Sequence, residues 1–567
     1  MAAVAPVPGP AATNVRHLAR VGSLPQVGDP RPGRAKLRVG VFADRARQPR
    51  WIVEALAKVA ACEFAELDFV ALESREGPPA NAEPLAWRAY RALDRRLFGA
   101  GDACADVDVG VLVSPERRFV YAKGGAREAL RRVAGAGKPV SAEIDVAFAI
   151  GDVDDATLEG LARHGTWRYC FGEDHAVREP LAAVREVIDA APVTASAIRI
   201  HRPGEADRIA CASWSRTVPF SLARTRDGVL AKSAQFLARA LRDLHAGGAP
   251  WLEQCTAPAQ PASLLRYPRG AALAGSLAKL AARVASRAAE HQLTVGQWQI
   301  AWRFADDEAW SGPLDAFHRL VPPKDRFWAD PFPVEANGRH YIFFEELPFA
   351  AGKAHISVVE VDRAGRASAP VRVLERDYHL SYPFLLEEGG TLYMIPESAH
   401  NRAIEVYRCV EFPHRWKLER AILRDVWAAD ATFHRAGDRW WMFAAMGADG
   451  GEVNDELHLF QSDRLLGDWK PHRRNPVRSD VRGARPAGRL FESGGALYRP
   501  GQVCTPIYGA AVALHRVTRL TEGEYAEEEV RRIAPAAGGD VIGMHTINRA
   551  GALSVTDLFV RRPRFAR

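Results

Sequence analysis

Five related stretches decide the fold of the second half of this chain: NGRHYIFFEE (337–346), GGTLYMIPES (389–398), GDRWWMFAAM (437–446), GGALYRPGQ (494–502) and AGALSVTDL (550–558). In each, a polar turn leads into an aromatic or apolar β-run. The repeat is roughly fifty residues long, which is typical of propeller blades of about four strands. Five repeats therefore predict a five-bladed β-propeller.

A short polar motif stands upstream of each β-run. Because the motifs occupy equivalent places in the repeat, we expect them on the strands nearest the axis, with side chains that converge on one end of the channel. Blades bury their faces only against neighbours, so the last run should complete a blade that begins near 297–304. The five motifs begin at Asp330, Ser381, Asp430, Arg485 and His545.

The first half of the chain has a different pattern of apolar residues. A β-run at 37–44 is followed by a helical pattern at 51–61, and further β-runs are expected at 107–114 and 138–151. Strands that alternate with helices of this length predict an α/β domain with a mostly parallel sheet.

The composition of the 567 residues excludes several classes of protein. Hydrophobic residues make up 47% and the net charge is only +7, which is globular and gives no argument for nucleic acid. Seven scattered cysteines show no metal-ligand spacing, and no glycine-rich nucleotide motif is present. We therefore expect no metal and no cofactor. The N-terminus does not resemble a signal peptide, which predicts a cytoplasmic protein.

The stretch RGAALAGSLAKLAARVASRAAEH (269–291) is a basic amphipathic helix. Its leucines could lie on an anionic membrane surface, which would make the protein membrane-associated. Alternatively, the helix is a linker that packs against a neighbouring domain. The complete organisation predicted is a disordered arm (1–35), an α/β domain (36–248), a linker with this helix (249–291) and the propeller (292–567).

Acidic and polar side chains are expected to gather at the mouth of the propeller channel. Facing carboxylates suit glycosidic chemistry, because one can donate a proton while another activates water or attacks the anomeric carbon. The catalytic candidates are Asp330, Asp430, Glu346 and Glu397. The candidates for substrate binding are Trp328, Tyr382, Arg485, Arg499, Gln502, His545 and Asn548.

The Asp330-Pro-Phe opening and the second acid, Asp430, resemble the five-bladed glycosidases such as arabinanases, β-xylosidases and β-fructosidases. In that family an Asp of blade one, an Asp of blade three and a Glu of blade four act together. Asp330 and Asp430 match the first two, whereas Arg485 stands where the Glu is expected. Glu492 lies seven residues further on, across a strand and near a turn, and is therefore a poor substitute.

A longer set of motifs resembles the propeller domain at the N-terminus of plant glucosamine inositolphosphorylceramide transferases. The motifs include FWADPF (327–332), HLSYPFL (379–385), ELHLFQSDRLLGDW (456–469) and GMHTIN (543–548). In the plant proteins, sugar transfer is attributed to a separate C-terminal domain that does not occur in this sequence. The resemblance implies a glycan or glycolipid context.

The stretch GTWRYCFGEDHAVREP (165–180) resembles the methionyl-tRNA-formyltransferase type of domain. That family uses an Asn, a His and a later Asp. Here Arg168 replaces the Asn and Cys170 replaces the His, whereas Asp207 could be the Asp. The resemblance therefore implies a degenerate formyltransferase-like domain.

Three functions remain open from the sequence. The first is a carbohydrate-active enzyme of polysaccharide or glycolipid biosynthesis that uses acids at the channel mouth, with a glycan or glycolipid, either neutral or anionic, as its partner. The second is a non-catalytic glycan-binding or scaffold module. The third is formyl or acyl transfer to an amino sugar by the N-terminal domain, which the residues at 168 and 170 disfavour.

Overall fold

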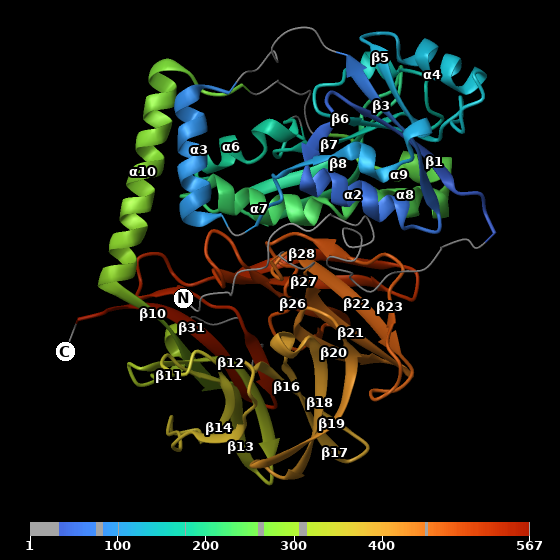
Figure 1. Ribbon diagram of the computed structural model, residues 1–567. Helices are drawn as coiled ribbons and strands as arrows, with labels where there is room; N and C mark the ends of the chain where they lie inside the picture. The colour runs from blue at the N-terminus through green and yellow to red at the C-terminus, as the bar shows by residue number, and fades with distance from the viewer. Residues whose placement is uncertain are drawn as a thin grey trace.

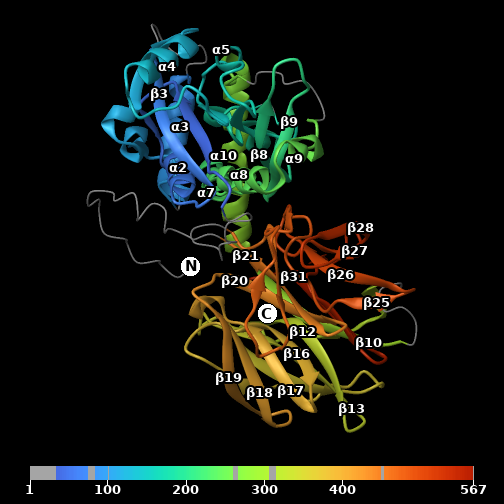
Figure 2. The ribbon, with the colours of Figure 1, turned by 90° about the vertical axis from the view of Figure 1, so that its right-hand side faces the viewer.

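The computed structural model describes residues 33–74, 83–99, 101–175, 177–258, 266–305, 314–447 and 452–565. They form an N-terminal α/β domain that sits on one end of a C-terminal β-propeller (Figures 1 and 2). Most of the arm predicted at 1–35 lies outside the described residues.

A seven-stranded sheet forms the centre of the N-terminal domain, in the order β5-β3-β1-β6-β7-β8-β9. Its first five strands are parallel, and each of the last two runs antiparallel to the strand before it. The prediction of an α/β domain with a mostly parallel sheet is confirmed. The strands are β1 (Leu37–Ala43), β3 (Ala65–Ser74), β5 (Arg118–Ala122), β6 (Val146–Ile150), β7 (Thr166–Phe171), β8 (Val193–His201) and β9 (Arg208–Arg216).

Helices cover both faces of this sheet. One face packs against α2, α7 and α8, and the other packs against α4 and α5. The helices of the domain are α2 (Arg50–Ala60), α3 (Leu85–Phe98), α4 (Ala126–Gly135), α5 (Asp155–Leu158), α6 (Val184–Asp189), α7 (Leu222–Ser233), α8 (Phe236–Gly247) and α9 (Ala249–Gln254).

One predicted strand of this domain is wrong. In place of a β-run over 107–114, the chain forms the end of β4 (Asp106–Asp108) and then a 3₁₀ turn over Val109–Leu112. The carboxylate of Asp108 accepts a hydrogen bond from Gly110 N at 2.8 Å, which starts the turn. Among the strands that the structure describes, β4 pairs with β2 (Arg47–Pro49) alone, in a separate two-stranded sheet.

The amphipathic helix is α10 (Gly270–Leu293), and it leads directly into the propeller. Leu273 and Leu280 are buried in the core of the N-terminal domain, with Leu277 packed against that core. The Arg283 guanidinium donates to three backbone carbonyls of the same domain, those of Val187, Ile188 and Pro219. These leucines are therefore packed against the N-terminal domain and are not available to contact a membrane, as the linker alternative expects.

Among the helices that the structure describes, none is both long enough and apolar enough to span a membrane.

Five β-sheets arranged in a ring form the propeller, as the repeats predicted (Figure 1). The first four blades follow the chain, with minor strands added to the third. They contain β12 (Arg326–Ala336), β13 (Arg339–Pro348), β14 (His355–Val361) and β15 (Val371–Leu374); β16 (Ser381–Glu388), β17 (Thr391–Glu397), β18 (Ala403–Glu411) and β19 (Arg415–Arg424); β20 (Ala428–Ala436), β21 (Arg439–Met446), β22 (Glu456–Ser462), β23 (Lys470–Pro471) and β24 (Arg478–Ser479); and β25 (Phe491–Ser493), β26 (Ala496–Val503), β27 (Ala511–Leu520) and β28 (Tyr525–Ile533).

The fifth blade joins both ends of the propeller sequence. β10 (Thr294–Phe304) pairs antiparallel with β31 (Leu553–Pro563) along its whole length, from Thr294 opposite Pro563 to Phe304 opposite Leu553. The ring closes in the predicted way. The same blade contains β11 (His318–Leu320), β29 (Val541–Gly543) and β30 (Ile547–Ala550).

Buried ion pairs hold the two domains together. The Arg239 guanidinium of α8 donates to both carboxylate oxygens of Glu456, at 2.6 and 2.8 Å. The Lys232 ammonium of α7 donates to Asp455 at 2.7 Å, and both side chains are buried. An uncompensated charge left in such a place is costly.

We expect Glu456→Gln to lower the free energy of unfolding by about 3–5 kcal/mol, because it leaves the buried Arg239 without a countercharge. Thermal denaturation followed by circular dichroism measures the loss. The control is Glu128→Gln in the exposed pair with Arg132, which should cost at most about 0.5 kcal/mol. Equal losses of stability from the two substitutions would contradict a stabilising role of the buried Arg239–Glu456 pair.

Candidate functional site

Three innermost strands present a side chain to the axis through the same backbone irregularity. The antiparallel register of blades one, two and three shifts at Asp330, Tyr382 and Asp430. All three residues have a positive φ, of 52°, 42° and 53°. Backbone of this kind persists only where its surroundings hold it, and it is concentrated at functional sites. The bulges of equivalent motifs thus bring residues of three blades to one place.

Asp330 is buried at the axis and is bound from two other blades. Thr546 Oγ1 donates to Asp330 Oδ1 at 2.8 Å, and Tyr382 N donates to Oδ2 at 3.2 Å. Burial, together with the neighbouring Asp430, raises the pKa of Asp330 to about 7, although the nearby His545 lowers it. The carboxyl group therefore exchanges its proton near neutral pH.

His545 lies between two acids. Its Nδ1 is 2.5 Å from Asp557 Oδ2, its Nε2 is 3.7 Å from Asp330 Oδ1, and its ring stacks on Trp298 with centroids 4.0 Å apart. Burial by itself would lower the pKa of His545, but the carboxylates of Asp557 and Asp330 raise it to about 9. The imidazole is consequently a cation that stabilises the negative charge around it.

Asp330, His545 and Asp557 have ligand-type atoms within 4.8 Å of one another, an arrangement that could hold a metal ion. The sequence spacing does not show this cluster. Asp557 already accepts hydrogen bonds from the backbone N–H groups of His545, Thr546 and Asp330. The Asp557 carboxylate thus connects the fifth blade, which closes the ring, to blade one.

Asp430 forms the centre of a second group, which we call the acid–arginine cluster: Glu397, Asp430, Arg485 and Gln502. The Arg485 Nε donates to Asp430 Oδ2 at 2.6 Å, and Gln502 Nε2 donates to the same oxygen at 2.7 Å. Arg485 NH2 lies 3.2 Å from Glu397 Oε2 and 3.3 Å from Asp430 Oδ1. The guanidinium therefore links carboxyl groups of blades two and three.

Glu397 and Asp430 have different electrostatic surroundings. Burial raises the pKa of Glu397 to about 8; Arg485 opposes this, and Asp430, which also hydrogen-bonds Glu397, adds to it. Asp430 has the closest contact with Arg485. Glu397 is therefore the member that is protonated at neutral pH, and the charge of Arg485 is balanced by Asp430.

Glu345 and His379 extend the cluster along the channel mouth. The His379 Nδ1 accepts a hydrogen bond from Ala354 N, and its Nε2 lies 3.2 Å from Glu345 Oε1. His400, which is exposed, lies beside His379 with ring centroids 5.5 Å apart. This side of the mouth is lined by imidazole and carboxyl groups.

Three predicted site residues lie elsewhere. Glu346 points to the opposite face of its strand and binds Arg326, Ser357 and His355, whose hydrogen bonds outweigh burial and lower its pKa to about 2. Arg499 is fully buried in a bidentate pair with Glu527 of β28. Trp328 packs in a hydrophobic cluster between blades.

Two further candidates for substrate binding have structural partners. The Tyr382 hydroxyl group hydrogen-bonds Thr432 Oγ1 at 2.8 Å and accepts a hydrogen bond from Gly488 N. Asn548 donates to the Pro331 carbonyl and accepts from Arg489 N. Both residues tie neighbouring blades to each other.

Two of the three candidates of the N-terminal domain, Arg168 and Asp207, belong to a network on its sheet. Arg168 is buried and donates to Asp155 Oδ1 and to the Val153 carbonyl. Asp207 binds Arg199 and His201. Burial raises the pKa of Cys170 to about 12, so its thiol stays protonated and does not serve as a base.

The acid–arginine cluster lies at the end of the channel that the N-terminal domain covers. Arg485 NH1 donates to Asn454 Oδ1 at 3.1 Å, Asn454 donates to Glu452, and Glu452 pairs with Arg216 of β9 at 3.0 Å. The other side of the cluster is closed by Tyr508, whose ring lies 5.3 Å from the Arg485 guanidinium.

Sequence reasoning did not include Asn454, Tyr508 and Asp557 in the site. Asn454 and Tyr508 lie in loops outside the repeated motifs, where periodicity carries no signal. Asp557 lies within the fifth repeated stretch, and this position is the feature of the sequence that could have placed it near the axis.

The fold and the cluster define a two-domain protein whose five-bladed propeller carries buried acids at its capped end. Residues 320–538 match the model of the family described as "Glucosamine inositolphosphorylceramide transferase 1, N-terminal". This match confirms the resemblance of the propeller motifs, whereas the formyltransferase resemblance stays a prediction.

Two plant proteins with that name are similar to this chain. The protein of Oryza sativa subsp. japonica is 36% identical over 208 residues, and that of Arabidopsis thaliana is 35% identical over 207 residues. Each alignment covers 36% of this chain, but only 28% and 27% of the plant proteins. The chain therefore matches less than a third of either relative.

Similar solved structures include Zg3597, a family 117 glycoside hydrolase of Zobellia galactanivorans, with 12% identity and a TM-score of 0.31 over 47% of this chain and 90% of that one. Another is the catalytic domain of a GH62 α-L-arabinofuranosidase of Coprinopsis cinerea, with 12% identity and a TM-score of 0.35 over 47% and 99%.

The charge of His545 predicts a pH-dependent stability. Its pKa is raised from 6.5 to about 9, so its stabilising contribution is present below pH 6.5 and is lost as the pH rises through 9. The full shift corresponds to on the order of 3 kcal/mol. Unfolding by urea at pH 6 to 9.5 should show this loss in the wild type and not in His545→Gln. The exposed His414→Gln serves as control and should keep the wild-type profile.

The environment of Cys170 predicts an unreactive thiol. At pH 8 a group with a pKa of about 12 is almost entirely protonated, and the side chain is buried. Iodoacetamide should therefore modify Cys170 only after denaturation, as measured by peptide mass spectrometry. Rapid alkylation of the folded protein would show an accessible thiolate at Cys170 and would contradict the conclusion that this residue cannot serve as a base.

Proposed function

We propose that this protein is carbohydrate-active and that its propeller acts on a glycosyl bond through the carboxyl groups at the channel mouth. The observation that carries the proposal is the acid–arginine cluster, in which one guanidinium, that of Arg485, holds both Asp430 and Glu397. Burial raises the pKa of Glu397 to about 8, and a carboxyl group that keeps its proton at neutral pH suits the acid of glycosidic chemistry. The plant relatives, whose name includes glucosamine and a transferase activity, support a carbohydrate context.

In the proposed reaction, Glu397 gives its proton to the oxygen of the leaving group while the bond from that oxygen to the anomeric carbon breaks. Asp430, which pairs with Arg485 at 2.6 Å, stabilises the positive charge that develops on the sugar. Asp330 takes the proton of the attacking hydroxyl group, since its pKa of about 7 suits a base at neutral pH. Water as the attacking group gives hydrolysis, and a hydroxyl group of a sugar or lipid gives transfer.

A specific observation favours a second candidate, a non-catalytic glycan-binding module. Both oxygens of Asp330 and of Asp430 accept hydrogen bonds within the protein, and blade four contributes Arg485 where the glycosidases have a Glu. Acids neutralised in this way could bind sugar hydroxyl groups without catalysis. The cytoplasmic location remains part of the proposal.

Turnover of a panel of glycans and nucleotide sugars separates the two candidates. If the propeller is catalytic, Glu397→Gln and Asp430→Asn should each lower kcat by about 10²–10⁴-fold, because the proton donor or the charge partner is lost. The control is Glu492→Gln, an exposed acid of blade four. The rate should also fall above about pH 8, where Glu397 loses its proton.

Turnover that survives both substitutions would remove the proposed acids from the mechanism. Glycan binding without turnover, unchanged by Glu397→Gln, would establish the binding module in place of the enzyme.

A further inference from the structure

Helix α3 of the N-terminal domain turns a row of leucines toward solvent. Leu85, Leu93 and Leu97 are 77%, 57% and 59% exposed. With Ala89, which is also exposed, they follow one another at four-residue spacing and therefore share one face of the helix, which we call the leucine stripe. Single exposed leucines are ordinary on a protein surface, whereas a row of them on one face marks an interaction surface.

The opposite face of α3 fixes this orientation. Trp87 is buried in the core of the N-terminal domain, and the Asp94 carboxylate accepts a hydrogen bond from Ala223 N of α7 at 2.6 Å. At the end of the helix, Phe98 meets Phe220 with ring centroids 5.5 Å apart. The helix would have to break these contacts to turn its leucines inward, so the exposure of the leucine stripe is a property of the folded domain.

A second row of residues beside the leucine stripe carries positive charge. Arg88 and Arg96, with Ala92 between them, each stand three residues from a member of the stripe, and all three are exposed. Among the residues that the structure describes, neither guanidinium group has a hydrogen-bond or ion-pair partner. The helix contains one acidic residue, Asp94, which is buried on the other face. The outer face of α3 is thus apolar and cationic.

The neighbouring acids are already paired with other basic groups. Glu83, just before the helix, pairs with Arg91 at 2.9 Å. α10 lies beside α3 at the same flank of the domain (Figures 1 and 2), and its one acid, Glu290, pairs with Arg287 at 2.9 Å. α10 also presents an exposed Lys279. The flank therefore keeps a positive surplus.

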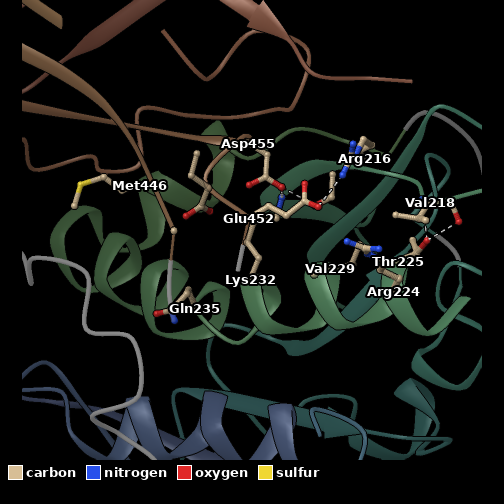
Figure 3. Close-up of a pocket in the computed structure, with 14 residues that line it drawn as sticks. Arg216, Val218, Arg224, Thr225, Val229, Lys232, Gln235, Met446, Glu452 and Asp455 are labelled. Carbon is tan, nitrogen blue, oxygen red and sulfur yellow. Dashed lines mark hydrogen bonds and ion pairs between the residues drawn. The ribbon is translucent and has the colours of Figure 1, made fainter. Parts of the chain in front are cut away.

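Basic side chains where the two domains meet differ from those of α3. Lys232 pairs with Asp455 and Arg216 pairs with Glu452, as Figure 3 shows. The protein thus neutralises these cations itself and uses them to join its domains. Arg88 and Arg96 have no such structural role, so their countercharge has to come from outside the chain.

The charge of the flank decides between two kinds of occupant. Two copies of this face in contact would bring the guanidinium groups of both copies together without an acid between them, and like charges in contact are costly. An anionic lipid surface satisfies both rows at once. Its acyl boundary accepts leucine side chains, while arginines on adjacent positions extend to the phosphates.

We propose that α3 binds the surface of an anionic lipid bilayer, with Leu85, Leu93 and Leu97 at the acyl boundary and Arg88 and Arg96 on lipid phosphates. The contact is peripheral and belongs to α3, since the leucines of α10 pack on the domain itself. It goes beyond the glycosyl chemistry proposed for the propeller and does not depend on it.

Co-sedimentation of the full chain with lipid vesicles tests the proposal. One set of vesicles contains equal parts of phosphatidylcholine and phosphatidylglycerol, and the other contains phosphatidylcholine alone. We expect binding to the anionic vesicles to be at least about tenfold stronger, because each arginine near an anionic surface contributes roughly fivefold. Added salt should weaken it by screening the charges. No binding to the anionic vesicles, or equal binding to both sets, overturns the proposal.

Paired substitutions locate the contact on α3. Leu93→Ser combined with Leu97→Ser should weaken binding to the anionic vesicles at least about tenfold, because two apolar side chains leave the interface. The matched control is Val120→Ser, at a 65% exposed position of β5, which should bind like the wild type. Because all these side chains are exposed, circular dichroism should show unchanged folding.

A charge series tests the second row. Arg88→Glu combined with Arg96→Glu should weaken binding at least about tenfold, and the two Arg→Lys changes at the same positions should largely preserve it. Arg131→Glu makes the same kind of charge change on the exposed side of α4 and should have no effect. Wild-type binding by either the double serine or the double glutamate variant overturns the proposal.

Light scattering after gel filtration separates a lipid surface from a second copy of the chain. We expect the wild type and the variant with Leu93→Ser and Leu97→Ser to have the mass of one chain. A wild-type dimer that dissociates in this variant would assign the leucine stripe to self-association and overturn the proposal. Loss of turnover in the propeller variants would leave vesicle binding unchanged, so the two proposals fail separately.

Discussion

Closure of the ring by β10 and β31 is the constraint on which the rest of the propeller depends. A blade has two faces that only its neighbours can bury, so an open series of blades would expose apolar surface at both ends. The pairing from Thr294–Pro563 to Phe304–Leu553 removes those ends. It also brings Asp557 and Thr546 against Asp330, over two hundred residues earlier in the chain. The first acid of the site is therefore held by the closing blade.

Closure concentrates charge at the axis, and the protein neutralises that charge in two different ways. Around Asp330 the countercharge is an imidazolium, His545, held by a further carboxylate. Around Asp430 it is a guanidinium, Arg485, which is linked through Asn454 and Glu452 to the N-terminal domain. Buried acids without such partners would lose their charge or unfold the site. The arginine of blade four thus joins the electrostatics of the channel to the domain that caps it.

Much of the architecture could be predicted because it follows from local periodicity. Aromatic runs after polar turns identified the blades, and the motif spacing placed Asp330 and Asp430 at equivalent positions. Side-chain direction was less accessible: Glu345 and Glu346 are neighbours, so a strand turns them to opposite faces, and only the register shows that Glu345 faces the mouth. Arg499 shares a strand with Gln502, yet it pairs with Glu527 on the outermost strand of the blade.

The sequence by itself determined the number of blades, the ring closure, the α/β character of the first domain and the acids that reach the axis, because each is encoded in short stretches of chain. Only the tertiary structure decided which of these acids hold protons, since that depends on burial and on charges from other blades. It also decided that the leucines of α10 pack on their own domain. The docking of the two domains has no signal in either half of the sequence, because it depends on pairs such as Lys232 and Asp455, which are 223 positions apart and meet only in the tertiary structure.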